Sequence, residues 1–598
     1  NFDNNQKMSQ LKTTLLKEFK DIFKTELDVH DRINIAPVKI ETNVHLASFK
    51  SSAKTTAIDT PLHLQNAATK ELNKMLKAGF LEESHHSTPY VSRGFFVAKP
   101  NSDNLKARLV ADFREVNKTL KRPGYPMDGS ALILKRLNPD ETFFSTLDLS
   151  SGYHQIRIAE SSRDLFTIVL PQGKYRYTVL PQGTSSSCDI FNLITDAGIR
   201  NVAGYFKNVD DVLTTSQTLE ELESRLRKLL EICRSRNIKL NPSKFSIGHE
   251  VTFGGVHLKG VKEKGDKTRK VYITPAEKRL EEFLAINTPK TKKEVQRVLG
   301  LANQLKRWVP ELAFSTLHLR KLSSIHAKFI WTKEHDLELT QLKEAIKNHV
   351  KLSPLDLNKP IHLHLDAAKC TGMGYILCQP RSDNEADGKT IITCNSTTFT
   401  DTQTRYSPFE CETLAVVWAT RSEDYYIRAA PCVEVFSDAK GMGGLFATEL
   451  GKVANPRLQA MLEKCLPYNL KFTYIRGEDN TVADFGSRQP RTKEQGEEFK
   501  IFNPMIATKS RRVYEKAFDC KDPQIDRIAE VADSDANYKR MIYHLENETP
   551  IRNMEADCEL RKMEGMIKDL SLHKTDSGKQ LILKNSVEVF IPEAFWLL

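Results

Sequence analysis

The sequence predicts a multidomain protein of mixed α/β and α+β class, and three observations lead to this fold class. The chain of 598 residues is long enough for about four domains of about 150 residues each. Hydrophobic residues make up 40% of it and charged residues 28%, as in globular proteins with a sizeable core. Strand-like apolar runs and segments with helical apolar spacing follow one another along the sequence.

Charge and cysteine content narrow the functional classes. The 88 Lys and Arg residues exceed the 77 Asp and Glu residues, and the net charge of +11 permits a polyanionic partner without requiring one. The 10 cysteines are scattered without a C-x-x-C pair. This favours reduced thiols in an intracellular protein over a disulfide framework or a zinc site. No apolar run approaches the roughly 18 residues that span a bilayer, so no membrane partner is expected.

The first part of the chain predicts two helices and a basic hairpin. Residues 1–30 contain an amphipathic helical run, and residues 65–78 form a second expected helix with Gly79 as its C-cap. Residues 95–100 and 105–114 are expected to form two strands around a polar turn. Lys99, Lys106 and Arg108 lie at the tip of this hairpin. Such a tip is either simply solvated or suited to a triphosphate.

Two strand-like runs carry acids. Residues 143–148 form an apolar strand that ends in Asp148, directly before a loop. Asp210 and Asp211 lie inside a second run, where adjacent carboxylates repel each other unless a cation neutralises them. Alone, this pair is either a solvated turn or a metal site at a hairpin bend. With Asp148 on a neighbouring antiparallel strand, the three carboxylates match the two-metal arrangement for in-line phosphoryl transfer.

Six motifs in a fixed order resemble the reverse transcriptase of retroviruses and gypsy-type LTR retrotransposons, over roughly residues 30–490. These motifs are residues 108–117, 143–156 and 180–183, the Asp210-Asp211 run, and residues 240–245 and 253–255. Six ordered motifs are far more specific than any one of them. The resemblance implies part of a Pol polyprotein, with a right-hand polymerase of fingers, palm, thumb and connection.

The resemblance also implies that Asp148, Asp210 and Asp211 bind Mg²⁺ or Mn²⁺, with two ions in the active site. One residue departs from the family pattern beside these acids. The family usually has an aromatic residue two positions before the Asp pair, and this chain has Asn208. The departure bears on primer positioning, fidelity and activity level, and not on the metal site itself.

Other residues carry roles that the resemblance implies for the substrate. Lys99 and Arg108 are expected to contact the incoming triphosphate, and Gln182 to contact the nucleotide. Tyr153 lies where the family keeps an aromatic gate against a ribose 2′-hydroxyl. Lys244 is either a proton donor to the leaving pyrophosphate or an exposed lysine after a turn.

A second set of acids follows Pro360. Asp366 and Asp438 each end a strand, Glu412 lies in a capped helix, and Asp484 is expected at the start of a last helix. Four acids on separate elements again indicate a two-metal site. In this order they resemble the acids of a ribonuclease H domain, which implies two further ions. Glu412 is preferred to Glu410 because it fits the family's helical register.

The expected domains follow from these patterns. They are a helical lead-in (1–30), fingers and palm (31–272), thumb and the start of the connection (273–359), a ribonuclease H-like α/β domain (360–490), and a linker with a small C-terminal α+β segment (491–598). The helical pattern is expected from Ile273 onward, and its Lys and Arg residues suit a nucleic-acid backbone.

The last segment resembles the lead-in to a retrotransposon integrase. One helix is expected to carry Leu560, Met563, Ile567 and Leu570 on one face, before a hairpin of residues 580–583 and 587–591. No zinc-ligand set follows, so integration activity is not expected. The start at Asn1 and the abrupt end suggest a piece processed or excised from a longer protein.

The predicted function is therefore an RNA- and DNA-templated DNA polymerase with ribonuclease H activity. Its expected partners are an RNA template, a DNA primer, an RNA–DNA hybrid and deoxynucleoside triphosphates, with a homodimer or heterodimer left open. The resemblance implies a cytoplasmic location within virus-like particles. The alternative is a non-catalytic nucleic-acid-binding subunit of an asymmetric dimer, or a decayed or domesticated element, for which Asn208 is the best support.

Overall fold

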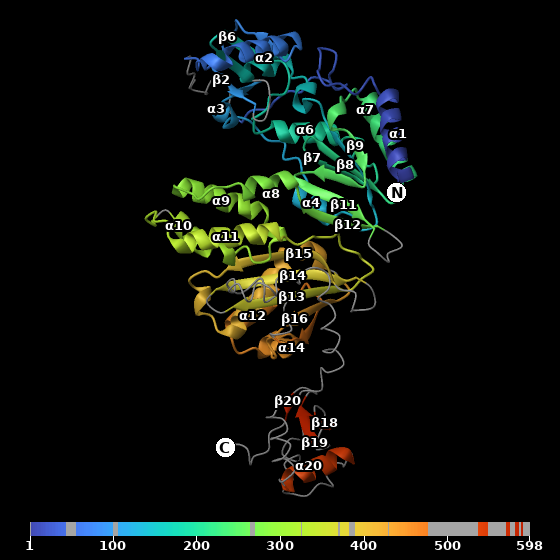
Figure 1. Cartoon of the computed structure of the whole chain (residues 1–598), viewed down its shortest axis with the longest axis vertical. Coiled ribbons are helices and arrows are strands. Elements are labelled where there is room, and N and C mark those ends of the chain that lie inside the picture. The colour runs from blue at the N-terminus through green and yellow to red at the C-terminus, as the bar shows by residue number, and fades with distance from the viewer. Residues whose placement is uncertain are drawn as a thin grey trace. The chain divides into compact units, whose positions relative to one another are not determined.

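The computed structural model (Figure 1) describes residues 2–43, 56–99, 106–262, 269–324, 326–368, 371–381, 389–428, 430–476, 536–547, 570–574, 580–584 and 588–589. The chain folds into two compact units. The first comprises Asn1–Arg381 and Lys389–Phe502, and the second comprises Ser382–Gly388 and Asn503–Leu598.

A five-stranded sheet forms the expected fingers. Its strand order is β1-β6-β5-β2-β3, with bounds β1 Leu81–Glu83, β2 Val91–Ala98, β3 Ala107–Ala111, β5 Thr167–Leu170 and β6 Gly173–Tyr177. Helix α2 (Gln65–Lys77) contacts β1 and β3 and buries Ala68, Leu72 and Met75, which share one helical face. The chain then turns at Gly79, where a φ of 62° is one that glycine adopts without strain.

The palm is a four-stranded antiparallel sheet in the order β7-β8-β4-β9. The strands are β4 Phe143–Asp148, β7 Tyr205–Asn208, β8 Asp211–Ser216 and β9 Ser246–Gly248. Helix α7 (Leu219–Ser235) packs on β4 and β8, and α1 (Phe2–Glu18) contacts α7 and β9. Helix α6 (Ser187–Asp196) precedes β7, and the short helices α3 (Arg114–Asn117), α4 (Ser130–Lys135) and α5 (Glu160–Arg163) lie in the connections. One hydrophobic core joins α1, the fingers and the palm.

A three-stranded sheet and four helices follow the palm. The sheet has the order β10-β11-β12, with β10 Glu250–Phe253, β11 Val256–Val261 and β12 Lys270–Pro275. Helices α8 (Glu277–Leu284), α9 (Lys292–Gln304), α10 (Leu317–Ser323) and α11 (Lys333–Lys347) contact one another and share a second core with this sheet. The prediction that the helical pattern starts at Ile273 is wrong, because β12 pairs with β11 through Pro275.

The next domain has a mixed five-stranded sheet in the order β15-β14-β13-β16-β17. Its strands are β13 Ile361–Ala368, β14 Gly372–Pro380, β15 Lys389–Thr398, β16 Val433–Ser437 and β17 Leu470–Tyr474. Helix α12 (Pro408–Ser422) packs on β13 and β14, and α13 (Asp424–Ile427), α14 (Met442–Ala447) and α15 (Pro456–Glu463) complete the domain. Because β16 is parallel to β13, both strands end at the same edge of the sheet.

The described part of the second unit contains α20 (Ala536–Glu546) and a three-stranded sheet. The sheet comprises β18 Leu570–Lys574, β19 Gln580–Lys584 and β20 Glu588–Val589. The predicted hairpin corresponds to β19 and β20. The prediction that Leu570 belongs to a helical face is wrong, because Leu570 pairs with Lys584 at the start of β18; Leu560, Met563 and Ile567 lie outside the described residues.

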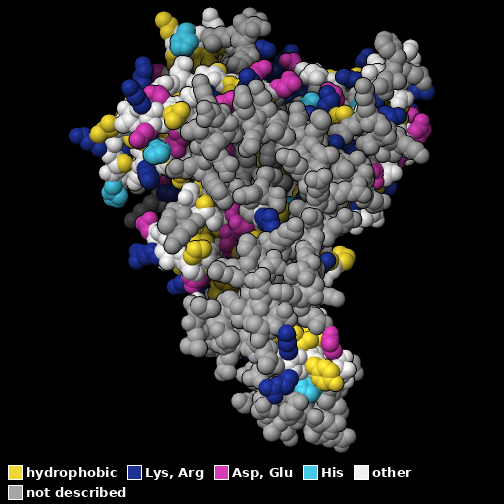
Figure 2. Space-filling view, turned by 60° about the horizontal axis from the view of Figure 1, so that its bottom comes forward, with side chains coloured by type: hydrophobic (Ala, Val, Ile, Leu, Met, Phe, Trp, Pro, Cys, Tyr) yellow, Lys and Arg dark blue, Asp and Glu magenta, His cyan; other side chains and the backbone are white. Residues whose placement is uncertain are grey.

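Charge is mixed on the visible surface. On the face shown in Figure 2, Lys and Arg side chains are interspersed with Asp and Glu side chains. Among the side chains coloured in this view, the basic residues do not form one continuous patch. Among the described residues, no helix has both the length and the apolar character needed to cross a bilayer.

Candidate active sites

Strand pairing brings the first three aspartates together at one end of the palm. Strands β4 and β8 are antiparallel, and their register places Asp148 directly opposite Asp211. Strands β7 and β8 form a tight hairpin in which Asn208 pairs with Asp211, so Val209 and Asp210 make the bend. Val209 has a φ of 59°, which is unusual for a β-branched residue. The hairpin thus carries Asp210 and Asp211 beside the end of β4.

Burial and mutual repulsion make these carboxylates unfavourable as free anions. Burial raises the pKa of Asp148, although Lys244 opposes this effect by donating to Asp148 Oδ1 at 2.7 Å. Burial also raises the pKa of Asp211, and the charges of Asp210 and Asp148 add to the shift. The desolvated carboxylates of Asp148 and Asp211, with Asp210 beside them and Lys244 as a counter-ion, are chemically suited to divalent cations.

The predicted nucleotide contacts lie on elements around this hairpin. Tyr153 lies in the turn after β4, half-buried, and stacks on Phe191 of α6 with 4.7 Å between the ring centroids. Gln182 is exposed at the turn before α6. Lys99 and Arg108 belong to the paired ends of β2 and β3 in the fingers sheet, a different sheet from the one that carries the aspartates.

Asn117 is a residue that the sequence analysis missed. Its side chain donates to the carbonyl of Gly183 at 3.1 Å and accepts from Ser185 N–H at 2.8 Å. It therefore fixes the turn that presents Gln182. Its place at the end of the motif at residues 108–117 was the available signal.

The second acid set lies where β13, β16 and α12 meet. Ligand oxygens of Asp366, Glu412 and Asp438 all lie within 4.8 Å of one another, as a group that could hold a metal ion. Together with neighbouring residues of β13 and α12 they line an open depression of about 470 Å³. The fourth predicted acid, Asp484, lies outside the described residues.

Glu412 is strongly desolvated in this cluster. Burial raises its pKa to about 9, and the charges of Asp366 and Asp438 contribute to the shift. Its Oε1 accepts from Ala367 N–H at 3.1 Å, whereas its buried Oε2 has no hydrogen-bond partner in the described part of the chain. An orphaned carboxylate oxygen beside two other acids is the donor set expected for a hard divalent cation.

Glu410 has a different environment from Glu412. It is the third residue of α12 and forms a capping box with Ser407, whose N–H donates to Glu410 Oε2 at 2.8 Å. Its other oxygen accepts from Arg457 at 2.8 Å. The Ser407 backbone contact is the main reason that the pKa of Glu410 is lowered.

The raised pKa of Glu412 predicts a pH-dependent stability in the absence of metal. The folded chain keeps the Glu412 proton up to about pH 9, whereas an unfolded glutamate loses it above about pH 4.3. Stability therefore falls as pH rises through this window, by at most about 1.4 kcal/mol per pH unit from this group. We expect Glu412→Gln to remove this loss, so that its advantage in thermal midpoint over wild type, measured in EDTA, grows from pH 5.5 to 8.5.

Glu410→Gln is the matched control for this measurement. Because the pKa of Glu410 is lowered, its contribution to stability is present at higher pH and is lost as pH falls. Its substitution therefore leaves the decline between pH 5.5 and 8.5 in place. Equal pH slopes for wild type and Glu412→Gln would contradict the burial of a protonated Glu412.

Two family models match the chain. Residues 97–258 match "Reverse transcriptase (RNA-dependent DNA polymerase)", and residues 331–433 match "RNase H-like domain found in reverse transcriptase". The chain carries a reverse transcriptase domain followed by an RNase H-like domain. The family resemblance expected from the six motifs is thus confirmed.

Known relatives agree with these domains. The chain is 28% identical over 498 residues to the Retrovirus-related Pol polyprotein from transposon 412 of Drosophila melanogaster, covering 80% of this chain and 38% of that protein. It is 25% identical over 512 residues to the Transposon Tf2-3 polyprotein of Schizosaccharomyces pombe, covering 81% of this chain and 36% of that protein. The chain therefore spans little more than a third of the length of these relatives.

A solved structure has the same fold. The foamy viral protease-reverse transcriptase in complex with an RNA/DNA hybrid aligns with a TM-score of 0.64 and 22% identity, over 80% of this chain and 61% of that one. The predicted fold class, a polymerase followed by a ribonuclease H-like domain, is confirmed.

Proposed function

We propose that the chain is a reverse transcriptase with ribonuclease H activity, which copies retroelement RNA into DNA. One observation carries this proposal. Within a reverse transcriptase domain, the β4–β8 register sets Asp148 opposite Asp211 and beside the hairpin residue Asp210. Three carboxylates gathered at one end of the palm support the proposal of a two-metal polymerase site.

In the proposed polymerase reaction, the 3′-oxygen of the primer forms a bond to the α-phosphorus of a deoxynucleoside triphosphate, and pyrophosphate leaves. Asp148, Asp210 and Asp211 would hold two Mg²⁺ or Mn²⁺ ions, whose charge activates the attacking oxygen and stabilises the leaving one. The chain's own side chains bind and orient the substrate. Lys99 and Arg108 would contact the triphosphate, with Gln182 and Tyr153 against the nucleotide in the roles expected from the sequence.

In the proposed ribonuclease H reaction, water cleaves a phosphodiester bond in the RNA strand of a hybrid. Asp366, Glu412 and Asp438 would hold the metal ions of this site, with Asp484 as the fourth ligand that the motif order implies. The depression beside these acids is open. This openness supports the proposal that an RNA backbone reaches the cluster.

The proposed partners follow from both sites. The foamy viral relative was solved with an RNA/DNA hybrid, and we propose a hybrid, an RNA template and a DNA primer as the nucleic acids for this chain. Deoxynucleoside triphosphates are its small substrates. We propose that it acts in the cytoplasm within virus-like particles, as a monomer or as a dimer.

Metal-dependent primer extension by the purified chain tests the proposed function. We expect extension of a DNA primer on RNA and DNA templates with Mg²⁺ or Mn²⁺, cleavage of the RNA strand of a hybrid, and loss of both activities in EDTA. A wild-type chain that binds primer–template but neither extends nor cleaves would instead support the non-catalytic subunit, which Asn208 at the hairpin favours.

A further inference from the structure

A buried lysine lies behind the aromatic residue that is expected to face the sugar of the nucleotide. Tyr153 and Phe191 are stacked, with an interplanar angle of 25°. On Phe191 lies the ammonium of Lys207, 5.1 Å from the ring centroid. Phe191 is completely buried. Lys207, Phe191 and Tyr153 thus form a continuous contact from strand β7 to the turn after β4.

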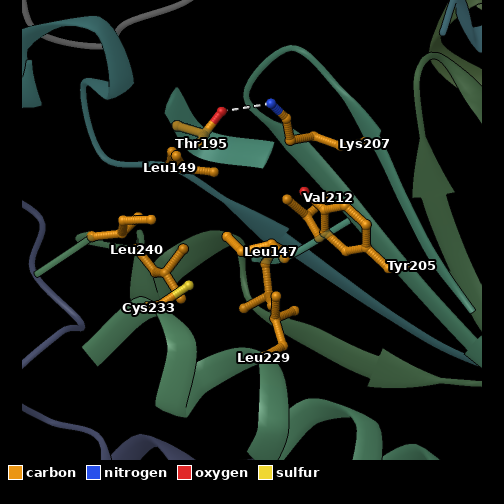
Figure 3. A pocket seen from close by; sticks show the side chains of 11 residues that line it. Leu147, Leu149, Thr195, Tyr205, Lys207, Val212, Leu229, Cys233 and Leu240 are labelled. Atoms are coloured by element: carbon orange, nitrogen blue, oxygen red, sulfur yellow. Dashed lines mark hydrogen bonds between the residues drawn. The ribbon is translucent and has the colours of Figure 1, made fainter. Parts of the chain in front are cut away.

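The Lys207 ammonium is held by three partners on helix α6. It donates to Asn192 Oδ1 at 2.7 Å and to Thr195 Oγ1 at 2.6 Å, and it pairs with Asp196 Oδ1 at 2.7 Å. Figure 3 shows the Lys207 side chain pointing toward Thr195 at the edge of a small apolar pocket. An ammonium has three donors. Two of them are used in the hydrogen bonds to Asn192 and Thr195, and the ion pair with Asp196 further restrains the charge beside Phe191.

Burying the charge of Lys207 costs free energy unless the ammonium is paired and hydrogen-bonded. Its side chain is only 4% exposed, and burial lowers the pKa of its ammonium although Asp196 opposes the effect. A cation near the last turn of α6 interacts favourably with the helix dipole. That interaction and the ion pair explain how the charge is tolerated, and the ring contact shows what it is placed against.

The other side of Phe191 is held equally closely. A Cβ added at Gly152 would lie 2.8 Å from Phe191 Cε2 and Cζ. Gly152 precedes Tyr153 directly, so the turn that carries the tyrosine has no room for the Phe191 ring to shift toward it. The ring is therefore confined between Lys207 and the turn.

We propose that Lys207 is a positioning residue for sugar selection, which acts through Phe191 to hold Tyr153 in place against the ribose 2′-hydroxyl. This inference rests on the proposed polymerase function. Lys207 would thus affect the choice between deoxyribose and ribose without contacting the nucleotide or the metal ions. The sequence gives no sign of it, because a lysine in a strand beside an active-site hairpin is ordinarily solvated.

The test compares incorporation of deoxynucleotides and ribonucleotides by Lys207→Met. We expect the ratio of kcat/KM for a dNTP to that for the matching rNTP to fall by about tenfold, while kcat for the dNTP stays within about threefold of wild type. If the unpaired Asp196 prevents folding, the variant Lys207→Met/Asp196→Asn removes both charges and gives the same readout. An unchanged ratio in a folded variant overturns the proposal, as does an equal fall for both nucleotides.

The pair Lys135–Glu423 is a matched control. Its charges are 2.6 Å apart, its side chains are 15% and 7% exposed, and Lys135 lies 4.9 Å from the ring of Tyr426. Lys135→Met/Glu423→Gln therefore removes a similar buried ion pair and ring contact that do not reach Tyr153. We expect an unchanged ratio.

A crystal structure of Lys207→Met decides the inference independently of activity. We expect the Tyr153 and Phe191 ring centroids to lie farther apart in the variant than in a wild-type crystal structure determined in the same way. An unaltered stack overturns the role of Lys207, even if the chain proves not to extend primers. Failure of wild-type extension would instead overturn the proposed function.

Discussion

Primer extension is expected to be lost in Asp210→Asn, while cleavage of an RNA–DNA hybrid persists. The substitution keeps the shape of the hairpin residue and removes one of the three charges that β4, β7 and β8 bring together. An amide is a poorer ligand for a hard cation than a carboxylate. Because bound ions stabilise the transition state of phosphoryl transfer by several kcal/mol, we expect a loss of at least about a thousandfold in kcat.

Asp128→Asn serves as the control for this experiment. Asp128 pairs with Arg136 at 2.6 Å, and both side chains are about a third exposed, so its substitution tests the loss of an aspartate at the surface. Exposed pairs contribute little to stability, typically about 0–1 kcal/mol. Extension within twofold of wild type is expected. Extension that survives in Asp210→Asn would refute the assignment of the palm hairpin as the polymerase site.

The sequence predicted the aspartate hairpin because two separate patterns agree there. One pattern is an apolar strand that ends in Asp148, and the other is a strand interrupted by the adjacent acids Asp210 and Asp211. These acids can approach Asp148 only if the second strand bends, and the β7–β8 turn provides this bend. The conformation of Val209 was not predictable, since positive φ is usual for Gly, Asn or Asp and not for a β-branched residue. Tertiary pairing on both sides of the bend overrides that local preference.

The environments of Glu410 and Glu412 also follow from a local signal. Ser407 and Glu410 have the S-x-x-E spacing of a capping box, and a side chain used to cap its own helix is less available as a ligand. The contact between Lys135 and Glu423 joins residues 288 positions apart, and no local pattern could reveal it. The same holds for Leu570, whose helical spacing is local whereas its pairing with Lys584 depends on a partner strand.

The Lys207 cluster escaped prediction for a different reason. Lys207 and its partners Asn192 and Asp196 are close in sequence. However, the sequence pattern predicts α6 and β7 as two independent elements, and within each element the polar residue is predicted to be exposed to solvent. The side chain of Lys207 is buried, and its ammonium contacts several side chains of α6, only because α6 packs beside the hairpin. A polar residue in a strand next to such an acidic hairpin therefore needs a structure before it can be interpreted.

The second large effect is expected from Asp366→Asn, which should abolish hybrid cleavage and leave primer extension intact. Asp366 is 4% exposed and belongs to the group whose oxygens lie within 4.8 Å of one another. Removing its charge weakens the attraction for a cation and relieves repulsion on Glu412, whose pKa is raised partly by Asp366. The lost ligand charge outweighs the easier deprotonation of Glu412, because the bound ions stabilise the transition state of phosphoryl transfer, so we expect a loss of at least about a thousandfold in cleavage.

Asp424→Asn is the control for this site, because Asp424 lies in the same domain but pairs with Arg428 near the surface at 2.9 Å. Cleavage by this variant should match wild type, and extension should be normal in both variants. The two aspartates 210 and 366 lie on different sheets with separate cores, so their substitutions should act independently and their effects should add in the double variant. Loss of extension in Asp366→Asn would show instead that the two sites depend on each other.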